Sequence, residues 1–293
     1  MTITAVLAVL LAAAPATADW FPGDGHKMHW PQLPDLTPEG MDVLASLAVE
    51  PQPQPALKVL ADDFRCTETG LITDIHIWGS WLNDFVPPEP DHGTFILGIY
   101  SDIPDPDGPG PEYSQPGDLL WNIQFKPGQY QVRLEATGPE QFYDPNIDQI
   151  IGQDNIAWQY NFLIDEPLAF QQEKDTIYWL SVANIDVNND NFVDFQDLAS
   201  VQFGENRFGW KTSRDHFNDD AVFIDDPDVW NQVVDLITPP AGTPGTVLPW
   251  QEMRYPIGHP FETQSIDLAF VITPEPATLA LLALGSLIMM RRK

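Results

Sequence analysis

The chain has 293 residues, with 43 acidic and 13 basic side chains, and its formal net charge at pH 7 is −30. A surface of that charge repels nucleic acids and anionic lipids and attracts divalent cations, so DNA and RNA are excluded as partners. Intrinsic disorder is also excluded, because 10 Trp, 16 Phe and 7 Tyr side chains supply enough apolar material for a core.

The N-terminal residues 1–18 have the pattern of a signal peptide. An apolar run from Ile3 to Ala14 is followed by Ala16-Thr17-Ala18, which satisfies the small-x-small rule for cleavage after Ala18. No Lys or Arg precedes the apolar run, and in this the segment departs from the usual pattern. A buried N-terminal helix is the alternative interpretation.

Residues 19–60 are rich in proline and only weakly periodic. We expect an N-terminal extension of extended or polyproline-like backbone in this range, lying against the following domain or free of it. The stretch from Met41 to Leu47 could form one or two helical turns. No site is predicted in this extension.

Residues 61–273 predict a β-domain. Ile75 and Ile77 alternate with polar neighbours as in a half-buried strand, and Gly79-Ser80 predicts a turn after it. Similar alternation occurs at Phe95–Ile99, Tyr130–Leu134, Trp158–Phe162 and Ile266–Ile272. Ile177–Val182 is apolar on both faces, as expected for a central strand. Many short strands with Pro/Gly turns indicate an all-β fold, specifically an antiparallel β-sandwich of jelly-roll type.

An insertion at residues 184–198 carries the spacing of a calcium-binding loop. Oxygen-bearing side chains occupy loop positions 1, 3, 5, 9 and 12, and a carbonyl serves at position 7. These residues are Asp186, Asn188, Asp190, Asp194 and Asp197, with the Phe192 carbonyl. The spacing predicts one structural Ca²⁺ ion, and the alternative is an acidic surface turn without metal.

The calcium loop resembles that of a dockerin, because Asp197 at position 12 is followed by Leu198. Two departures limit this resemblance. Asn191 stands at position 6, where such loops have glycine, although Asn tolerates the left-handed backbone conformation. Dockerins pair two loops and this sequence has one, so docking to a cohesin is not implied.

Other candidate site residues have two interpretations each. Asp215, His216, Asp219 and Asp220 could form an acid/base group or a second metal site, or simply a solvated acidic loop. Tryptophan side chains could include a stacking platform for sugars, or could fill the core. The tryptophans concerned are Trp78, Trp81, Trp121, Trp158, Trp210, Trp230 and Trp250. Cys66 has no partner for a disulfide, so we expect a buried thiol, and His76 is expected to be neither ligand nor base.

The C-terminal residues combine a Pro274-Glu275-Pro276 triplet, an apolar run over Ala277–Met290 and a basic end, Arg291-Arg292-Lys293. The apolar run is shorter than the roughly 20 residues of a spanning helix, and the basic end favours the cytoplasmic side. This tail resembles the PEP-CTERM sorting signal of exported bacterial proteins. The resemblance implies a hydrophobic sorting helix, a transient inner-membrane tether and an exosortase that processes the tail. A plain C-terminal anchor is the alternative.

The domain also resembles a domain of unknown function found in exported bacterial proteins that often carry the same tail. The resemblance covers most of residues 25–273 and implies an architecture and an exported location but no activity. The matching stretches are Ala61–Phe64, Cys66, Gly70, Asp74–His76, Trp78–Trp81, Phe208–Ser213 and Asn218–Ala221.

Taken together, these features predict an exported, non-catalytic protein of the cell surface or extracellular matrix, with a calcium-stabilised β-sandwich. A module that binds exopolysaccharide or other glycans is the alternative. A glycan-active enzyme would need two carboxylates about 5–10 Å apart across a cleft, which a sequence does not reveal.

Overall fold

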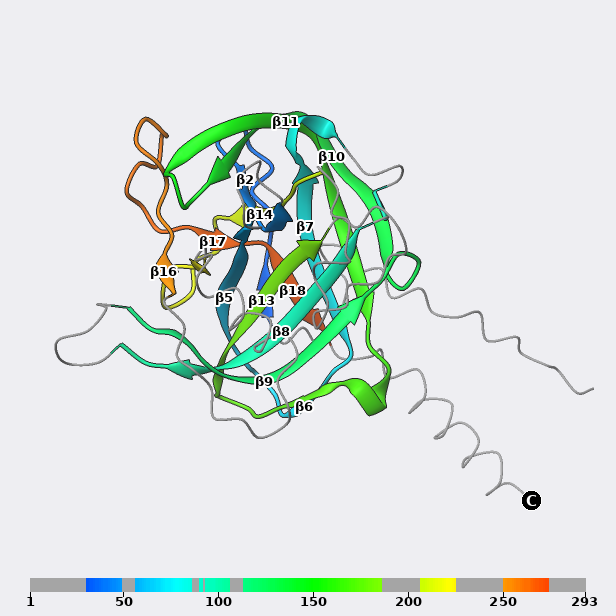
Figure 1. Cartoon of the computed structure of the whole chain (residues 1–293). Helices are drawn as coiled ribbons and strands as arrows, with labels where there is room; N and C mark the ends of the chain where they lie inside the picture. The colour runs from blue at the N-terminus through cyan, green and yellow to red at the C-terminus, as the bar shows by residue number, and fades with distance from the viewer. Residues whose placement is uncertain are drawn as a thin grey trace, which may run out of the picture.

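The computed structural model describes residues 30–48, 56–85, 90–91, 93–105, 113–185, 206–224 and 250–273. Strands dominate these residues, and the helical elements are short 3-10 turns, η1 (Leu82–Asp84) and η2 (Glu166–Leu168). The expected all-β class with antiparallel sheets is confirmed (Figure 1). Within these ranges, no helix is long and apolar enough to cross a membrane. The predicted signal peptide, calcium loop and sorting tail lie outside the described residues.

The strands pair across long stretches of sequence. In chain order they are β1 (Trp30–Gln32), β2 (Met41–Leu44), β3 (Ser46–Ala48), β4 (Ala56–Leu57), β5 (Val59–Arg65), β6 (Gly70–Ile72), β7 (Asp74–Trp81), β8 (Thr94–Ile103), β9 (Gln115–Phe125), β10 (Gln131–Asp144), β11 (Gln149–Leu163), β12 (Phe170–Gln172), β13 (Ile177–Ile185), β14 (Phe208–Ser213), β15 (Val222–Ile224), β16 (Gln251–Glu252), β17 (Asp267–Leu268) and β18 (Phe270–Thr273).

The first sheet has the strand order β1-β18-β7-β11-β10-β2-β14-β17, and β7 also pairs with β14. Five of these strands therefore pair in a closed circuit, β7–β11–β10–β2–β14–β7. We call this circuit the strand ring. The β10–β2 pair is parallel and the other four pairs are antiparallel.

The second sheet has the order β16-β15-β5-β13-β3-β4, with β8 on the other edge of β13 and β9 beyond β8. Its central strand β13 runs antiparallel to both β5 and β8. A separate small pair joins β12 to β6. The described strands thus form two main sheets that share one core.

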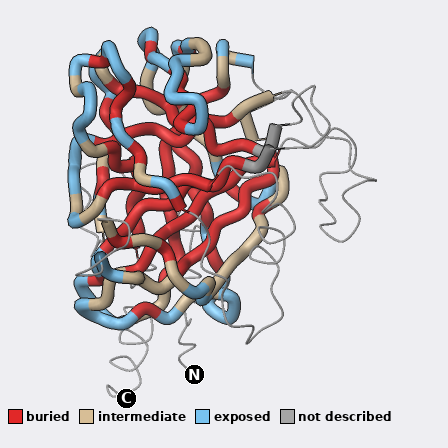
Figure 2. The backbone as a smooth tube through the Cα atoms, turned by 60° about the vertical axis from the view of Figure 1, so that its left-hand side comes forward, coloured by how far each residue is buried: buried red, intermediate tan, exposed pale blue. Residues whose placement is uncertain are grey.

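Aromatic side chains from both sheets fill this core. Phe95 of the second sheet lies with its ring centroid 4.9 Å from Tyr160 and 5.0 Å from Phe208, both from the first sheet. The indole N–H of Trp81 donates a hydrogen bond of 2.9 Å to the Tyr160 hydroxyl. In Figure 2 the buried residues form a continuous interior, while exposed residues collect at the loops and the outer strands.

All the strands expected from the sequence are present, as β7, β8, β10, β11, β13 and the β17–β18 segment. Two local expectations were wrong. Met41–Leu44 is strand β2 and not a helical turn, because its backbone pairs with β10 and β14. Gly79 and Ser80 do not form a turn, since β7 continues through them to Trp81 while pairing with β11 and β14.

The expected boundary at residue 61 falls inside β5. Strands β1 to β4 precede it, in the range where the sequence predicts a Pro-rich extension, and they are hydrogen-bonded into the two main sheets. Of these, β2 is part of the strand ring. Prolines did not prevent pairing, because Pro31 lies in the edge strand β1 and Pro38 lies between strands.

Candidate functional site

The strand ring encloses a group of polar side chains, one from each of its strands. The members are Ser80 (β7), Asp154 (β11), Glu140 (β10), Asp42 (β2) and Lys211 (β14), and we call them the ring cluster. Glu140 is the cross-strand partner of Asp154, and Lys211 is the partner of Asp42. Side chains of cross-strand partners share one face of a sheet. Side chains from all five strands can approach one another only on the inner side of the strand ring.

The ring cluster is buried, and only some of its polar atoms have hydrogen-bond or ion-pair partners. Ser80, Asp42, Asp154 and Lys211 are each 0% exposed, and Glu140 is 8% exposed. The Lys211 ammonium donates to Asp42 Oδ2 at 3.4 Å and more closely to Glu140 Oε2. One oxygen from each of the three carboxyl groups lies within 4.8 Å of the others. Both Asp154 oxygens and the Ser80 hydroxyl lack a hydrogen bond of ordinary geometry, although Ser80 lies close enough to Asp42 and Asp154 to lower the pKa of both carboxyl groups.

Burial dominates the electrostatics of the ring cluster. It raises the pKa of Asp154 to about 9 and that of Glu140 to about 7, and the negative Asp42 beside them adds to both shifts. Burial also raises the pKa of Asp42, against the lowering effect of the Lys211 ammonium. The pKa of Lys211 is raised, since the attraction of Asp42 and Glu140 outweighs the burial that would lower it.

A cavity of about 240 Å³ adjoins the ring cluster at Glu140. Its other walls are residues 36–38, residues 136–139 and Ala157. The cavity lies beside the irregular part of β10, where the register with β11 shifts between Thr137 and Glu140. Of the ring cluster, Glu140 is the member that also lines this cavity.

The rest of the ring interior is tightly packed around the Phe142 ring. A Cβ atom placed on Gly209 of β14 would lie 2.6 Å from Phe142 Cζ and 2.9 Å from Asp42 Cβ. Both distances are too short for carbon atoms in contact. Glycine at this position therefore lets the ring close around a phenylalanine.

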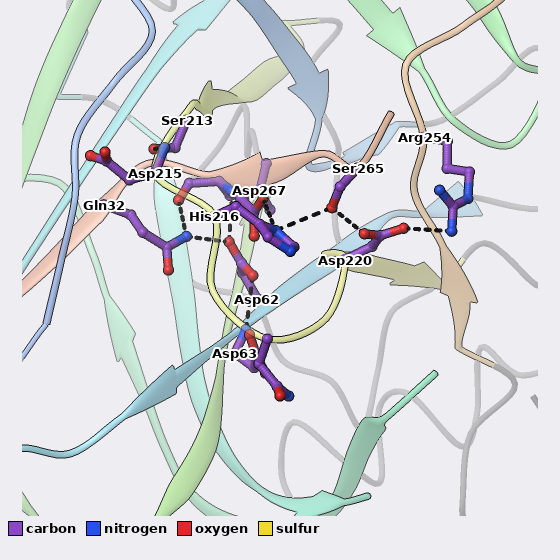
Figure 3. Close-up of polar contacts among 12 residues, drawn as sticks. Gln32, Asp62, Asp63, Ser213, Asp215, His216, Asp220, Arg254, Ser265 and Asp267 are labelled. Carbon is purple, nitrogen blue, oxygen red and sulfur yellow. Dashed lines mark hydrogen bonds and ion pairs between the residues drawn. The ribbon is translucent and has the colours of Figure 1, made fainter. Parts of the chain in front are cut away.

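A second polar network is built around Asp62 and Asp63 in the middle of β5, where segments from distant parts of the chain converge (Figure 3). Asp62 Oδ2 accepts hydrogen bonds from Gln32 Nε2 at 2.8 Å and from the Leu268 backbone N–H at 2.6 Å. Asp63 Oδ2 accepts one from Asn218 Nδ2 at 2.9 Å. Burial raises the pKa of Asp63 to about 9, and the neighbouring Asp62 carboxyl group adds to the shift.

His216 in this network does not form a nucleophile–base–acid relay. Its Nδ1 lies 2.8 Å from Asp267 Oδ2, and Ser265 Oγ lies 3.3 Å from the same Nδ1. A serine hydrolase needs the carboxylate at one ring nitrogen and the serine at the other, so that the proton can cross the imidazole. Ser265 also donates to Asp220 Oδ1 instead of being held for attack.

The acidic group predicted around His216 is only partly brought together. Asp220 reaches His216 through Ser265 and makes an ion pair of 3.0 Å with Arg254 (Figure 3). Asp219 accepts hydrogen bonds from Ser114 and Asn218. Asp215 accepts one from the Leu33 backbone at 3.0 Å.

The other predicted candidates are mostly buried. Trp78, Trp81, Trp210 and Trp250 are buried, Trp121 and Trp158 are half-buried, and Trp230 lies outside the described residues. This placement removes most of the proposed sugar platform. Cys66 is the expected buried thiol and donates to Gln172 Oε1 at 2.6 Å. His76 is buried with Nε2 3.0 Å from Asp74 Oδ2.

The predicted calcium ligands and both targeting segments lie outside the described residues. These comprise Asp186, Asn188, Asp190, Phe192, Asp194, Asp197, Ala18, Pro274, Glu275, Pro276, Arg291, Arg292 and Lys293. The ring cluster is not predicted from the sequence, because its members come from five separate segments. One available signal is Lys211, a charged residue within the otherwise strand-like Phe208–Ser213 stretch.

Comparison with protein families assigns the domain to a family. Residues 28–273, more than half of the chain, match the family described as Domain of unknown function (DUF7901). The chain belongs to the DUF7901 family. Residues 273–293 match the PEP-CTERM protein-sorting motif, which indicates an exported protein recognised by exosortase-type machinery and processed at the membrane. No match was found among curated proteins or among solved structures. The DUF7901 match includes β1 to β4, so these strands lie within the family's domain.

Proposed function

We propose that this DUF7901 protein is a non-catalytic protein of the cell surface or extracellular matrix, stabilised by one Ca²⁺ ion in the loop at 186–197. The PEP-CTERM motif supports an exported destination. The net charge of −30 supports a calcium-rich setting, because divalent cations reduce the self-repulsion of such a chain.

The observation that carries the calcium assignment is the place of the loop in the fold. Asp186 directly follows Ile185, the fully buried end of β13 in the second sheet. The chain next enters a described strand at Phe208, the fully buried start of β14 in the first sheet. An ion held by Asp186 and its neighbours would stabilise the connection between central strands of the two sheets.

The described polar groups offer little to a catalytic mechanism, which supports the non-catalytic part of the proposal. The Ser265–His216–Asp267 contacts converge on one imidazole nitrogen and leave no path for a proton relay. Burial raises the pKa of the Cys66 thiol to about 12, so the nucleophilic thiolate is scarce at neutral pH.

The test is the melting temperature of the purified full chain in calcium and in EDTA. Calcium at about 100 times its dissociation constant should add about 2.7 kcal/mol, which for a domain of this size is about 5–10 °C. Asp186→Ala and Asp190→Ala should each remove the part of that increase that the loop contributes, while leaving the melting temperature in EDTA almost unchanged. Glu166→Ala, which removes one exposed carboxylate elsewhere, is the matched control and should keep the full calcium effect. Equal effects in the loop variants and the control would refute the assignment.

A further inference from the structure

We propose that the interior of the strand ring is a second divalent-cation site, in which Asp42, Glu140 and Asp154 bind Ca²⁺. This site is separate in sequence from the loop at 186–197, and it stands whether or not that loop binds metal. Its ligands come from β2, β10 and β11, which are adjacent strands of the ring.

The spacing of the carboxyl oxygens fits calcium. Oxygens bound to one Ca²⁺ ion lie at about 2.3–2.6 Å from it, so two ligands can be at most about 5 Å apart. The oxygens of Asp42, Glu140 and Asp154 lie within 4.8 Å of one another. Mg²⁺ demands near-ideal octahedral geometry and usually keeps several of its water ligands, which a buried cluster of protein oxygens does not suit. The ring therefore favours calcium over magnesium.

The buried Ser80 hydroxyl group offers a further oxygen at the same place. Ser80 is fully buried, and its Oγ makes no hydrogen bond of ordinary geometry. It is nevertheless close enough to Asp42 and Asp154 to influence both carboxyl groups. A buried hydroxyl without a partner is costly, roughly 1–3 kcal/mol. As a neutral oxygen beside two carboxylates, it is suited to be a further calcium ligand.

Asp154 also lacks ordinary hydrogen bonds, and it does so at two oxygens. Both of its carboxyl oxygens are buried and neither makes a hydrogen bond of ordinary geometry. Among the described residues, the Lys211 ammonium forms its ion pairs with Asp42 and Glu140. A cation between Asp154 and the other two carboxyl groups would give the Asp154 oxygens a partner.

Charge balance supports a divalent ion specifically. When all three carboxyl groups are ionised, as calcium ligands are, they and the Lys211 ammonium carry a formal charge of −2 in a buried space. Uncompensated charge of that size is strongly disfavoured in a protein interior. One divalent cation makes the ring interior neutral without displacing the lysine.

The ion also has access and room for water. Glu140 is both a member of the ring cluster and a lining residue of the cavity of about 240 Å³, so the cavity adjoins the proposed site. Calcium takes 6–8 oxygen ligands, more than the ring supplies. A water molecule occupies about 30 Å³, so the cavity has room for the waters that complete the coordination.

The experiment is calorimetric titration of the purified full chain with CaCl₂ after EDTA treatment and removal of the EDTA. To isolate the ring, the chain carries Asp186→Ala and Asp190→Ala, which disable the loop. This loop-disabled chain should bind one Ca²⁺ ion, and at least tenfold more tightly than Mg²⁺. Adding Asp154→Asn should weaken Ca²⁺ binding at least tenfold. Adding Asp63→Asn instead, a change at an equally buried carboxyl group outside the ring, should leave binding unchanged.

Each result decides between the two calcium assignments. If the loop-disabled chain binds no calcium, or if Asp154→Asn binds as tightly as its parent, the ring site is refuted. If wild type and the loop-disabled chain bind the same number of ions, the loop assignment fails and the ring site stands. Asp154→Asn is nearly isosteric and removes an unpartnered carboxyl group, so it should fold, as circular dichroism can verify. Ser80→Ala is the second variant, and it too must weaken binding for the proposal to hold.

Discussion

The substitution Gly209→Ala tests whether the strand ring is closed around a packed interior. Gly209 lies on β14, between its cross-strand partners Leu44 of β2 and Ser80 of β7. The added Cβ would lie 2.6 Å and 2.8 Å from two atoms of the Phe142 ring and 2.9 Å from Asp42 Cβ. The backbone at Gly209 is not in the left-handed region, so alanine introduces no conformational strain of its own.

The expected cost follows from how little the neighbours can move. Phe142 is fully buried inside the ring, and Asp42 Cβ is fixed by the pairing of β2 with both β10 and β14. Inserting a methyl group into such an interior costs about 1–3 kcal/mol. For a domain of this size, that corresponds to a decrease in melting temperature of about 3–10 °C.

The assay is thermal unfolding of the full chain followed by circular dichroism in EDTA. Gly70→Ala is the matched control, because a Cβ at Gly70 of β6 would meet nothing within 4 Å. It should change the melting temperature little or raise it slightly. The double variant Phe142→Leu with Gly209→Ala should lose less stability than the sum of its parts, by at least about 0.5 kcal/mol. If Gly209→Ala and Gly70→Ala have the same melting temperature, the ring is not closed around Phe142. The same conclusion follows if the stability losses of Phe142→Leu and Gly209→Ala are additive.

Two further predictions concern the other buried groups. The pKa of Asp63 is raised by burial to about 9 and that of Asp267 to about 8, from unfolded values near 3.8. At a pH between the unfolded and the folded pKa values, these two carboxyl groups are protonated in the folded chain and ionised in the unfolded chain. The free energy of unfolding should therefore fall as pH rises from 5 to 8, by up to about 1.4 kcal/mol per pH unit for each group. Asp63→Asn should reduce that slope in urea titrations, and an unchanged slope would contradict the prediction. Cys66, buried with a raised pKa, should react with a thiol reagent only as fast as the chain unfolds, so rapid labelling of the native protein would show that the thiol is accessible.

The fold class could be predicted from the sequence because strand alternation is a local signal. Ile75 and Ile77 face the core and His76 faces the opposite side, as the period of two requires. In a half-buried strand that opposite side meets solvent, yet His76 is fully buried. That face of β7 is covered by other parts of the chain, among them Ala269 and Val271, which pack against Trp78. The alternation within one strand does not reveal whether distant segments bury its second face.

The two local errors have the same origin. Gly79-Ser80 has the composition of a turn, but β7 is held extended there by pairing with Trp158 on one side and Gly209 and Trp210 on the other. Met41–Leu44 has apolar residues that a short helix could also use, but strands far along the chain pair with it on both edges. Tertiary hydrogen bonding outweighed local propensity in both places.

The sequence by itself determined the features that depend on composition and on contiguous motifs. The negative charge, the all-β class, the DUF7901-like stretches and the PEP-CTERM tail can all be identified from neighbouring residues. The tertiary structure alone decided that Asp42, Glu140, Asp154, Lys211 and Ser80 share one interior. Their five strands become neighbours only when β7 pairs with β14 and the circuit closes. Long-range pairing sets which side chains meet, and no local pattern in the sequence encodes it.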